Sequence, residues 1–248
     1  MAPHQPRPDS VRADIQVIVR KEDLDSQRLS SAVVIVIDTL FATTTIVAAL
    51  ERGAAAVVPA LSATDAREIA SSLGKLDGVL LAGELMAKTL AGFAPPTPLA
   101  LAALGVEDKT IVYSTTNGTV ALRQASGAHA VYAACLRNAR ATAQHILAHH
   151  PAQTVLIVCA GSAGNFNLED FYTAGWLARH FVTAGKNRLN DAAFAAHDAA
   201  VGNHREVLLR SRVGQLYCAR FPEEIDFAAE ADCVGLVALF QGGRVTRL

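Results

Sequence analysis

The fold of this chain is decided by residues 33–45, which read Val-Val-Ile-Val-Ile-Asp-Thr-Leu-Phe-Ala-Thr-Thr-Thr. The β-branched apolar run predicts a strand that is covered on both faces, as in a parallel sheet. Asp38 then lies at the carboxyl end of that strand, where open α/β sheets bind ligands. The threonines precede a second apolar run, so they are candidate caps of a helix whose N-terminus could bind an anion. An acid beside that helix could hold a divalent metal. The threonines fit a purely capping role equally well, with Asp38 as a brace for the loop.

The composition restricts the classes of function. The chain has 248 residues, of which 51% are hydrophobic and 18% are charged, and its formal net charge is -1. This balance gives no general attraction to nucleic acid or to an anionic membrane, so a local site must select any ligand. The four cysteines form no C-x-x-C pair, and no apolar run is long enough to span a membrane. We therefore expect a cytoplasmic protein with reduced thiols.

The order of elements predicts one large domain. Residues 1–12 contain three prolines and little apolar surface, so we expect a disordered head. Residues 13–248 contain no linker long enough to divide them, and we expect a single α/β domain with helices at 190–202 and 205–219. The sparsely charged surface also leaves room for a homodimer.

Part of this pattern occurs twice. A strand that ends in hydroxyl groups, a helix and a second strand follow each other from residue 33 and again from residue 110. Gly53, Ala54, Ala56 and Val57 recur 74 residues later as Gly127, Ala128, Ala130 and Val131. The common order suggests an internal duplication, although four identities in such common residue types also arise by chance. A third strand and loop begin at residue 154.

Three apolar strands of this sequence end in polar loops, at residues 38–45, 114–119 and 161–170. In a parallel sheet these ends converge on one edge, together with the acid Glu84. Carboxylates suit Mg²⁺, and hydroxyl and N–H groups suit phosphate oxygens, so the set favours metal-assisted phosphoryl chemistry. The chain has no P-loop, no G-x-G-x-x-G motif and no G-x-S-x-G elbow, which argues against the protein classes defined by those motifs.

The motifs together resemble the 2-phosphosulfolactate phosphatase (ComB-like) family. The resemblance covers most of the chain and is most specific at Asp-x-x-x-Ala-Thr-Thr-Thr (38–45) and Ser-Thr-Thr-Asn-Gly-Thr (114–119). Further matching segments are Gly83-Glu84, Gly92-Phe93, Glu169-Asp170 and residues 224–230. The resemblance implies a three-layer α/β sandwich with a largely parallel or mixed sheet. It also implies a phosphoric monoester hydrolase that uses Mg²⁺ to remove phosphate from a small sulfonated hydroxy acid.

The resemblance also implies roles for individual residues. The catalytic and metal-binding acids would be Asp38, Glu84 and Asp170. The phosphate- or substrate-binding residues would be Thr43, Thr44, Thr45, Thr115, Thr116, Asn117, Gly118, Thr119 and Asn165.

Two positions depart from the family pattern. Phe41 stands where the family has an arginine, and Ala-Pro-Pro-Thr-Pro at 94–98 replaces an Asn-Ser-Pro loop. An arginine is the natural bidentate partner of phosphate or sulfonate, so its loss points to a less anionic substrate or to lost activity. Arg137 could supply a charge from elsewhere, or it could be an ordinary surface residue.

The sequence is therefore compatible with three functions. The first is a magnesium-dependent phosphatase acting on a small acidic phosphate monoester. The second is a diverged, non-catalytic protein that keeps the anion pocket without turnover. The third is an α/β enzyme of unrelated chemistry, in which the threonine runs are only caps.

Overall fold

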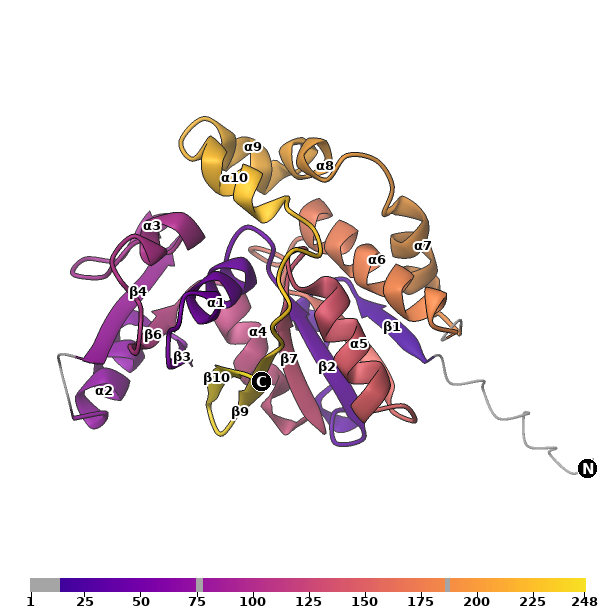
Figure 1. Ribbon diagram of the computed structural model, residues 1–248, viewed down its shortest axis with the longest axis horizontal. Coiled ribbons are helices and arrows are strands. Elements are labelled where there is room, and N and C mark those ends of the chain that lie inside the picture. Colours follow the sequence, from indigo (N-terminus) through magenta and orange to yellow (C-terminus); the bar gives the residue numbers. More distant parts are fainter. Residues whose placement is uncertain (1–13, 75–77, 186–187) are drawn as a thin grey trace, which may run out of the picture.

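The computed structural model describes residues 14–74, 78–185 and 188–248, so the predicted disordered head at 1–12 lies outside the described residues. The described strands form one mixed sheet in the order β1-β8-β2-β7-β9-β10-β3-β6-β4-β5 (Figure 1). In chain order the strands are β1 (Ile15–Ile18), β2 (Ala32–Ile37), β3 (Ala56–Ala60), β4 (Val79–Leu85), β5 (Lys88–Thr89), β6 (Thr110–Ser114), β7 (Ala130–Ala134), β8 (Thr154–Cys159), β9 (Ala238–Gln241) and β10 (Arg244–Arg247).

Helices largely alternate with strands in the first part of the chain, whereas the last five helices of the described residues follow one another without a strand between them. The single helix predicted at 205–219 is two helices in the structure. The helices are α1 (Ala42–Glu51), α2 (Ala63–Ser72), α3 (Pro98–Ala102), α4 (Gly118–Gln124), α5 (Ala139–His149), α6 (Leu168–Thr183), α7 (Asp191–Ala199), α8 (His204–Arg210), α9 (Arg212–Cys218) and α10 (Pro222–Ala228). Among the described residues, no helix combines the length and the apolar character that crossing a bilayer requires.

The sheet consists of two parallel halves joined by a hairpin. Strands β1, β8, β2 and β7 run parallel in the first half, and β3, β6 and β4 run parallel in the second. The hairpin β9–β10 lies between them and pairs antiparallel with β7 on one side and with β3 on the other. Its turn is Gly242-Gly243, and both glycines have positive φ, which suits residues without a Cβ. The last strand therefore closes the gap between the halves.

The first half is covered on both faces, as its apolar strands predict. Side chains of β2 alternate between two core clusters, with Val34 and Val36 in one and Val33 and Ile35 in the other. Helices α1 and α4 contribute to the first cluster, whereas α5, α6 and α7 contribute to the second. This arrangement confirms the three-layer α/β sandwich.

The two similar units run across the sheet in opposite directions. The unit β2-α1-β3 starts in the first half and ends in the second, whereas β6-α4-β7 starts in the second half and ends in the first. As a result β2 pairs with β7 and β3 pairs with β6. The two helices begin against each other, because a Cβ added to Gly118 would lie 2.5 Å from the Cβ of Ala42. The polar loops after β2 and β6 therefore meet where the halves join.

The C-terminal helices α8, α9 and α10 cover this junction (Figure 1). Their apolar side chains pack on Leu40 and Phe41 from the loop after β2. Glu224 of α10 also reaches the second half, where its two carboxylate oxygens accept the N–H groups of Leu99 and Ala100 at 2.8 and 3.0 Å. The C-terminal segment thus contacts both halves above the site.

Candidate active site

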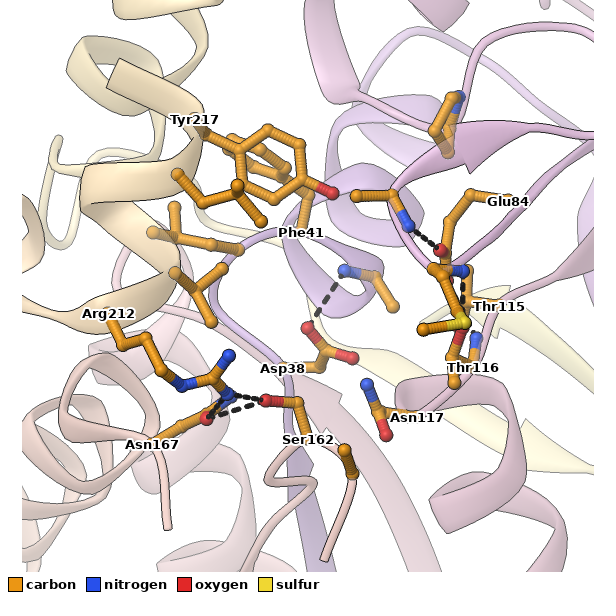
Figure 2. A pocket seen from close by; sticks show the side chains of 18 of the residues that line it. Asp38, Phe41, Glu84, Thr115, Thr116, Asn117, Ser162, Asn167, Arg212 and Tyr217 are labelled. Atoms are coloured by element: carbon orange, nitrogen blue, oxygen red, sulfur yellow. Dashed lines mark hydrogen bonds between the residues drawn. The ribbon is translucent and has the colours of Figure 1, made fainter. Parts of the chain in front are cut away.

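A cavity of about 240 Å³ lies where the loops after β2, β6 and β8 meet the β4–β5 hairpin and α9 (Figure 2). One part of its wall is polar and another part is apolar. The polar residues that line it are Asp38, Glu84, Thr115, Thr116, Asn117, Ser162, Asn167 and Arg212. The predicted convergence of the three polar loops is therefore present, although the loop after β6 approaches from the other half of the sheet.

Asp38 lies in the middle of this cavity. One carboxylate oxygen accepts the N–H of Ala42 at 3.3 Å, so the first turn of α1 holds the side chain. The hydroxyl of Thr43 fixes the main chain, since it accepts the Asp38 N–H at 3.0 Å and donates to the Asp38 carbonyl at 2.9 Å. Burial raises the pKa of Asp38 to about 7, and the negative charges of Glu84 and Glu169 act in the same direction.

Gly118 makes room for this carboxylate. A Cβ at residue 118 would lie 2.7 Å from Oδ2 of Asp38, which is closer than real Cβ atoms approach. Gly118 is therefore required for packing against the acid.

Glu84 lines the cavity on the side of the second half. Its Oε1 accepts both the N–H and the hydroxyl of Thr116, at 2.7 and 2.8 Å. Its Oε2 accepts the N–H of Ala87 at 2.7 Å. Glu84 therefore fastens the loop after β6 to the β4–β5 hairpin and places Thr116 at the cavity wall.

Asp170 lies outside the set of residues that line the cavity. It is buried, and its two carboxylate oxygens accept the N–H groups of Thr39 at 2.9 Å and of Gly161 at 3.1 Å. Burial raises its pKa well above the usual range, and the charges of Glu169 and Asp38 add to this effect. This geometry makes Asp170 a brace between the loops after β2 and β8, and its predicted role as a metal ligand stays a prediction.

The three threonines of the opening stretch are also buried and do not line the cavity. The hydroxyls of Thr43, Thr44 and Thr45 donate to the carbonyls of Asp38, Thr39 and Pro96, respectively. A contact between these hydroxyls and phosphate would cost those hydrogen bonds. The predicted role of these threonines as caps is wrong, because they lie inside α1, whose N-cap is Phe41 without a side-chain cap hydrogen bond. Their hydroxyls instead hold the loop after β2 and the loop at Pro96 against the helix.

Only some residues of the second threonine run, 114–119, line the cavity. Thr115, Thr116 and Asn117 line the cavity, whereas the hydroxyl of Thr119 is buried and donates to the Thr115 carbonyl at 3.0 Å. Asn165 is exposed and outside the lining, and its amide donates to the Ala163 carbonyl. Ser162 and Asn167 take the corresponding place in the cavity wall.

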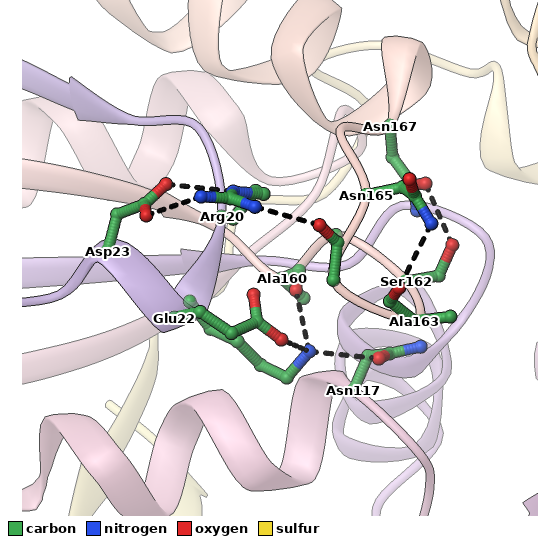
Figure 3. Close-up of polar contacts among 12 residues, drawn as sticks. Arg20, Glu22, Asp23, Asn117, Ala160, Ser162, Ala163, Asn165 and Asn167 are labelled. Carbon is green, nitrogen blue, oxygen red and sulfur yellow. Dashed lines mark hydrogen bonds and ion pairs between the residues drawn. The ribbon is translucent and has the colours of Figure 1, made fainter.

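Lys21 is a buried residue whose role the sequence did not indicate. Its Nζ donates to Oδ1 of Asn117 at 3.0 Å and to the Ala160 carbonyl at 3.1 Å, and it pairs with Glu22 at 2.8 Å (Figure 3). Because Oδ1 is taken, the amide group of Asn117 is left to face the cavity as a donor (Figure 2). Lys21 therefore orients the amide group of Asn117 towards the cavity.

Arg212 was also missed, because it lies on a short C-terminal helix far from the strand motifs. Its guanidinium donates to the hydroxyl of Ser162 and to Oδ1 of Asn167. Arg212 is the one cationic side chain among the described residues that line the cavity. It is the charge that could bind an anionic group of a ligand there.

Arg137 does not serve that purpose. It is buried outside the cavity, pairs with Glu51 and Glu230, and lies over the ring of Phe227 with its guanidinium carbon 3.7 Å from the centroid. Arg137 holds α10 to the first half of the sheet.

The other departure from the family pattern, the loop at 94–98, forms part of the cavity wall. The Pro96 carbonyl accepts the hydroxyls of Thr45 at 2.8 Å and of Tyr113 at 2.5 Å. These two hydrogen bonds fix the loop beside the site.

The oxygen donors of the cavity fit a single magnesium ion. Among the described residues, no three His, Cys, Asp or Glu side chains lie together as a ready metal site. Mg²⁺ needs less than that, because it is commonly held by one or two carboxylates, several waters and a substrate phosphate. Asp38 and Glu84 line the same cavity and would supply the carboxylates.

The fold and this site define an α/β protein with a cavity at the junction of two half-sheets, lined by two acids, one arginine and several hydroxyl and amide groups. Comparison with known proteins gives the family. A model of the 2-phosphosulpholactate phosphatase family matches residues 18–243, and the chain belongs to this family of phosphoric monoester hydrolases.

Named relatives cover nearly the whole chain. A "probable 2-phosphosulfolactate phosphatase" of Clostridium beijerinckii is 28% identical over 237 residues, which span 94% of this chain and 98% of that protein. Proteins with the same name from Symbiobacterium thermophilum and Thermotoga maritima are each 34% identical, over 90% and 84% of this chain and 97% and 89% of their own lengths.

Proposed function

We propose that this protein is a magnesium-dependent phosphatase that hydrolyses a small acidic phosphate monoester. The observation that supports the proposal most is the position of Asp38. A carboxylate lies at the junction of the two half-sheets, inside a cavity that also presents Glu84, the amide of Asn117 and the guanidinium of Arg212. This combination can bind a cation and an anion next to each other. The family and the names of the relatives support the phosphatase part of the proposal.

Each group would have a distinct task. Asp38 and Glu84 would hold Mg²⁺, which neutralises charge on the phosphoryl oxygens when it is bound. The amide of Asn117, whose oxygen is held by Lys21, would donate to a phosphate oxygen. Arg212 would bind a carboxylate of the substrate. A water would attack the phosphorus, so that the new P–O bond replaces the ester bond and the alcohol leaves with a proton.

The test is the release of inorganic phosphate from a panel of phosphorylated hydroxy acids that includes 2-phosphosulfolactate. We expect release with Mg²⁺, no release with EDTA, and a loss of about 100-fold or more in Asp38→Asn. Asp191→Asn is the matched control, because Asp191 is exposed on α7, whose bounds exclude every cavity residue. An equal loss in both variants, or release that ignores EDTA, would contradict the proposal.

The non-catalytic alternative gives a different result in the same experiments. A protein that keeps only the pocket would show a higher melting temperature with phosphate and Mg²⁺ but no phosphate release from any ester. The carboxylates of Asp38 and Glu84 are held in place by main-chain N–H groups, and this preorganisation favours the catalytic function.

A further inference from the structure

The cavity has an apolar wall opposite its polar groups. Phe41 and Leu40 come from the loop after β2, and Val213, Leu216 and Tyr217 come from α9. In Figure 2 the rings of Phe41 and Tyr217 lie together above Asp38. Their centroids are 5.0 Å apart with an interplanar angle of 76°, an edge-to-face contact that fixes both rings. A ligand that extends from Asp38 towards α9 would therefore contact apolar side chains.

The charges of the cavity also restrict which ligands it can bind. Asp38 and Glu84 are the acids of the wall, and Arg212 is its single cation among the described residues. Arg212 already donates to Ser162 and Asn167, and its charge also acts on the buried carboxyl of Glu169. One magnesium ion and Arg212 bring three positive charges, whereas the two wall acids, a phosphate dianion and a carboxylate bring five negative charges, so the occupied site already carries an excess of negative charge. A further strong anion would be buried against the apolar wall without a partner, which is costly.

We propose that the substrate of this protein is the phosphate ester of a 2-hydroxy acid with an apolar or aromatic group at carbon 3, and that Phe41 determines this specificity. The proposal rests on the proposed phosphatase function and names its substrate class. The phosphate binds between Asp38 and Asn117, the carboxylate binds Arg212, and the apolar group packs against Phe41 and Leu216. The third position of the substrate thus carries hydrocarbon instead of a sulfonate.

The phenol of Tyr217 agrees with this arrangement. Tyr217 is 9% exposed and packs edge-to-face on Phe41. A phenol has no cationic form, so this side chain provides no positive charge that could attract a sulfonate.

Two esters that differ only at carbon 3 test the proposal: 2-phospho-3-phenyllactate and 2-phospho-3-sulfolactate. We expect the wild-type protein with Mg²⁺ to favour the phenyl ester in kcat/KM by on the order of 10- to 100-fold. Phe41→Arg should reverse that preference, whereas Phe41→Leu should keep it because the wall stays apolar. Equal or faster hydrolysis of the sulfonated ester by the wild-type protein would overturn the proposal.

A second variant keeps the proposal testable if Phe41→Arg does not fold. Phe41 is buried, but Leu216 is 54% exposed while it lines the cavity, so Leu216→Arg places a cation at the same wall without entering the core. It should shift the preference towards the sulfonated ester in the same direction as Phe41→Arg. No shift in a folded Leu216→Arg protein would count against the apolar wall as the determinant.

A binding measurement separates this inference from the proposed function. Calorimetric titration of the wild-type protein with 3-phenyllactate and with 3-sulfolactate, each with phosphate and Mg²⁺ present, needs no catalysis. Tighter binding of 3-phenyllactate supports the inference even if neither ester is hydrolysed, in which case only the phosphatase function fails. Equal binding of the two acids overturns the inference even if both esters are hydrolysed.

Discussion

Residue by residue, the site depends on groups that hold other groups in place. Asp38 is held by Ala42 and Thr43, Glu84 by Thr116 and Ala87, and Asn117 by Lys21. A carboxylate or amide fixed in this way does not have to be ordered again when a ligand binds. The precision of the cavity therefore comes from main-chain N–H groups and from one buried lysine.

Lys21→Met is expected to lower kcat/KM by about 10- to 100-fold while leaving the protein folded. Methionine fills the space of the lysine stem but cannot donate to Asn117, so the amide is no longer oriented towards the cavity. Steady-state phosphate release measures the effect, and circular dichroism confirms the fold. The control is Lys88→Met on the exposed strand β5. Full activity in Lys21→Met would show that the lysine only fills space.

The raised pKa of Asp38 predicts a pH dependence of metal binding. The pKa of about 7 lies above the ordinary value of 3.8, so the metal-free protein retains this proton up to near-neutral pH. The proton competes with Mg²⁺, and the affinity for Mg²⁺ should fall as the pH falls through about 7. The increase in melting temperature caused by Mg²⁺ should therefore be larger at pH 8 than at pH 6. An Asp38→Asn protein should show neither the increase nor its pH dependence.

The raised pKa of Asp38 also affects the stability of the metal-free protein. Between the unfolded and the folded pKa of Asp38, the folded state binds more protons than the unfolded state. The contribution of this group to the free energy of unfolding is therefore greatest in acid and is lost as the pH rises through about 7. Bound Mg²⁺ is expected to offset that loss.

At this scale the sequence was informative where a residue directly follows a strand. Asp38, Thr115, Thr116 and Asn117 were predicted as site residues on that ground, and all four line the cavity. Lys21 and Arg212 were not identified, because each lies in a polar segment or a short helix where a charge is usually exposed to solvent. Only the tertiary fold brings them to the site.

Among the elements, the C-terminal helices show that a helix start within a continuous apolar pattern can be overlooked. The apolar spacing over 205–219 predicted one helix, but the structure has α8 and α9. The hydroxyl of Ser211 accepts the N–H of Gly214 at 2.8 Å and starts a new helix there. Gly214 packs so closely on the Leu208 carbonyl that a Cβ would lie 1.9 Å from it. This bend turns Arg212 and Tyr217 towards the cavity.

Glu224 joins the last of these helices to α3, and Glu224→Gln tests that connection. A glutamine keeps one acceptor for the N–H groups of Leu99 and Ala100 and loses the charge, while the Cα of residue 224 is unchanged. We expect a loss of about 1–3 kcal/mol in the free energy of unfolding, together with a higher KM, measured by urea denaturation and phosphate release. The exposed neighbour gives the control, Glu223→Gln, which should change neither. Equal stability of the two variants would mean that α10 does not depend on this contact.

In the whole molecule, the site exists because two half-sheets meet. The sequence predicted that three strand ends would converge on one edge of a parallel sheet, and the cavity does collect all three loops. It did not predict that β9 and β10 would separate the halves, because a short C-terminal hairpin carries no sign of its pairing partners. The repeated strand–helix–strand order was visible in the sequence, but its crossed arrangement depends on which strands pair.

The central claim, that the junction of the two halves binds magnesium and phosphate, is tested most directly by a crystal grown with Mn²⁺ in place of Mg²⁺ and with phosphate. Mn²⁺ takes similar oxygen ligands and gives an anomalous signal that locates the metal. We predict one anomalous peak beside the carboxylates of Asp38 and Glu84, with phosphate in contact with the metal and with the amide of Asn117. A metal bound elsewhere, or a cavity without metal and phosphate at saturating concentrations, would contradict the claim.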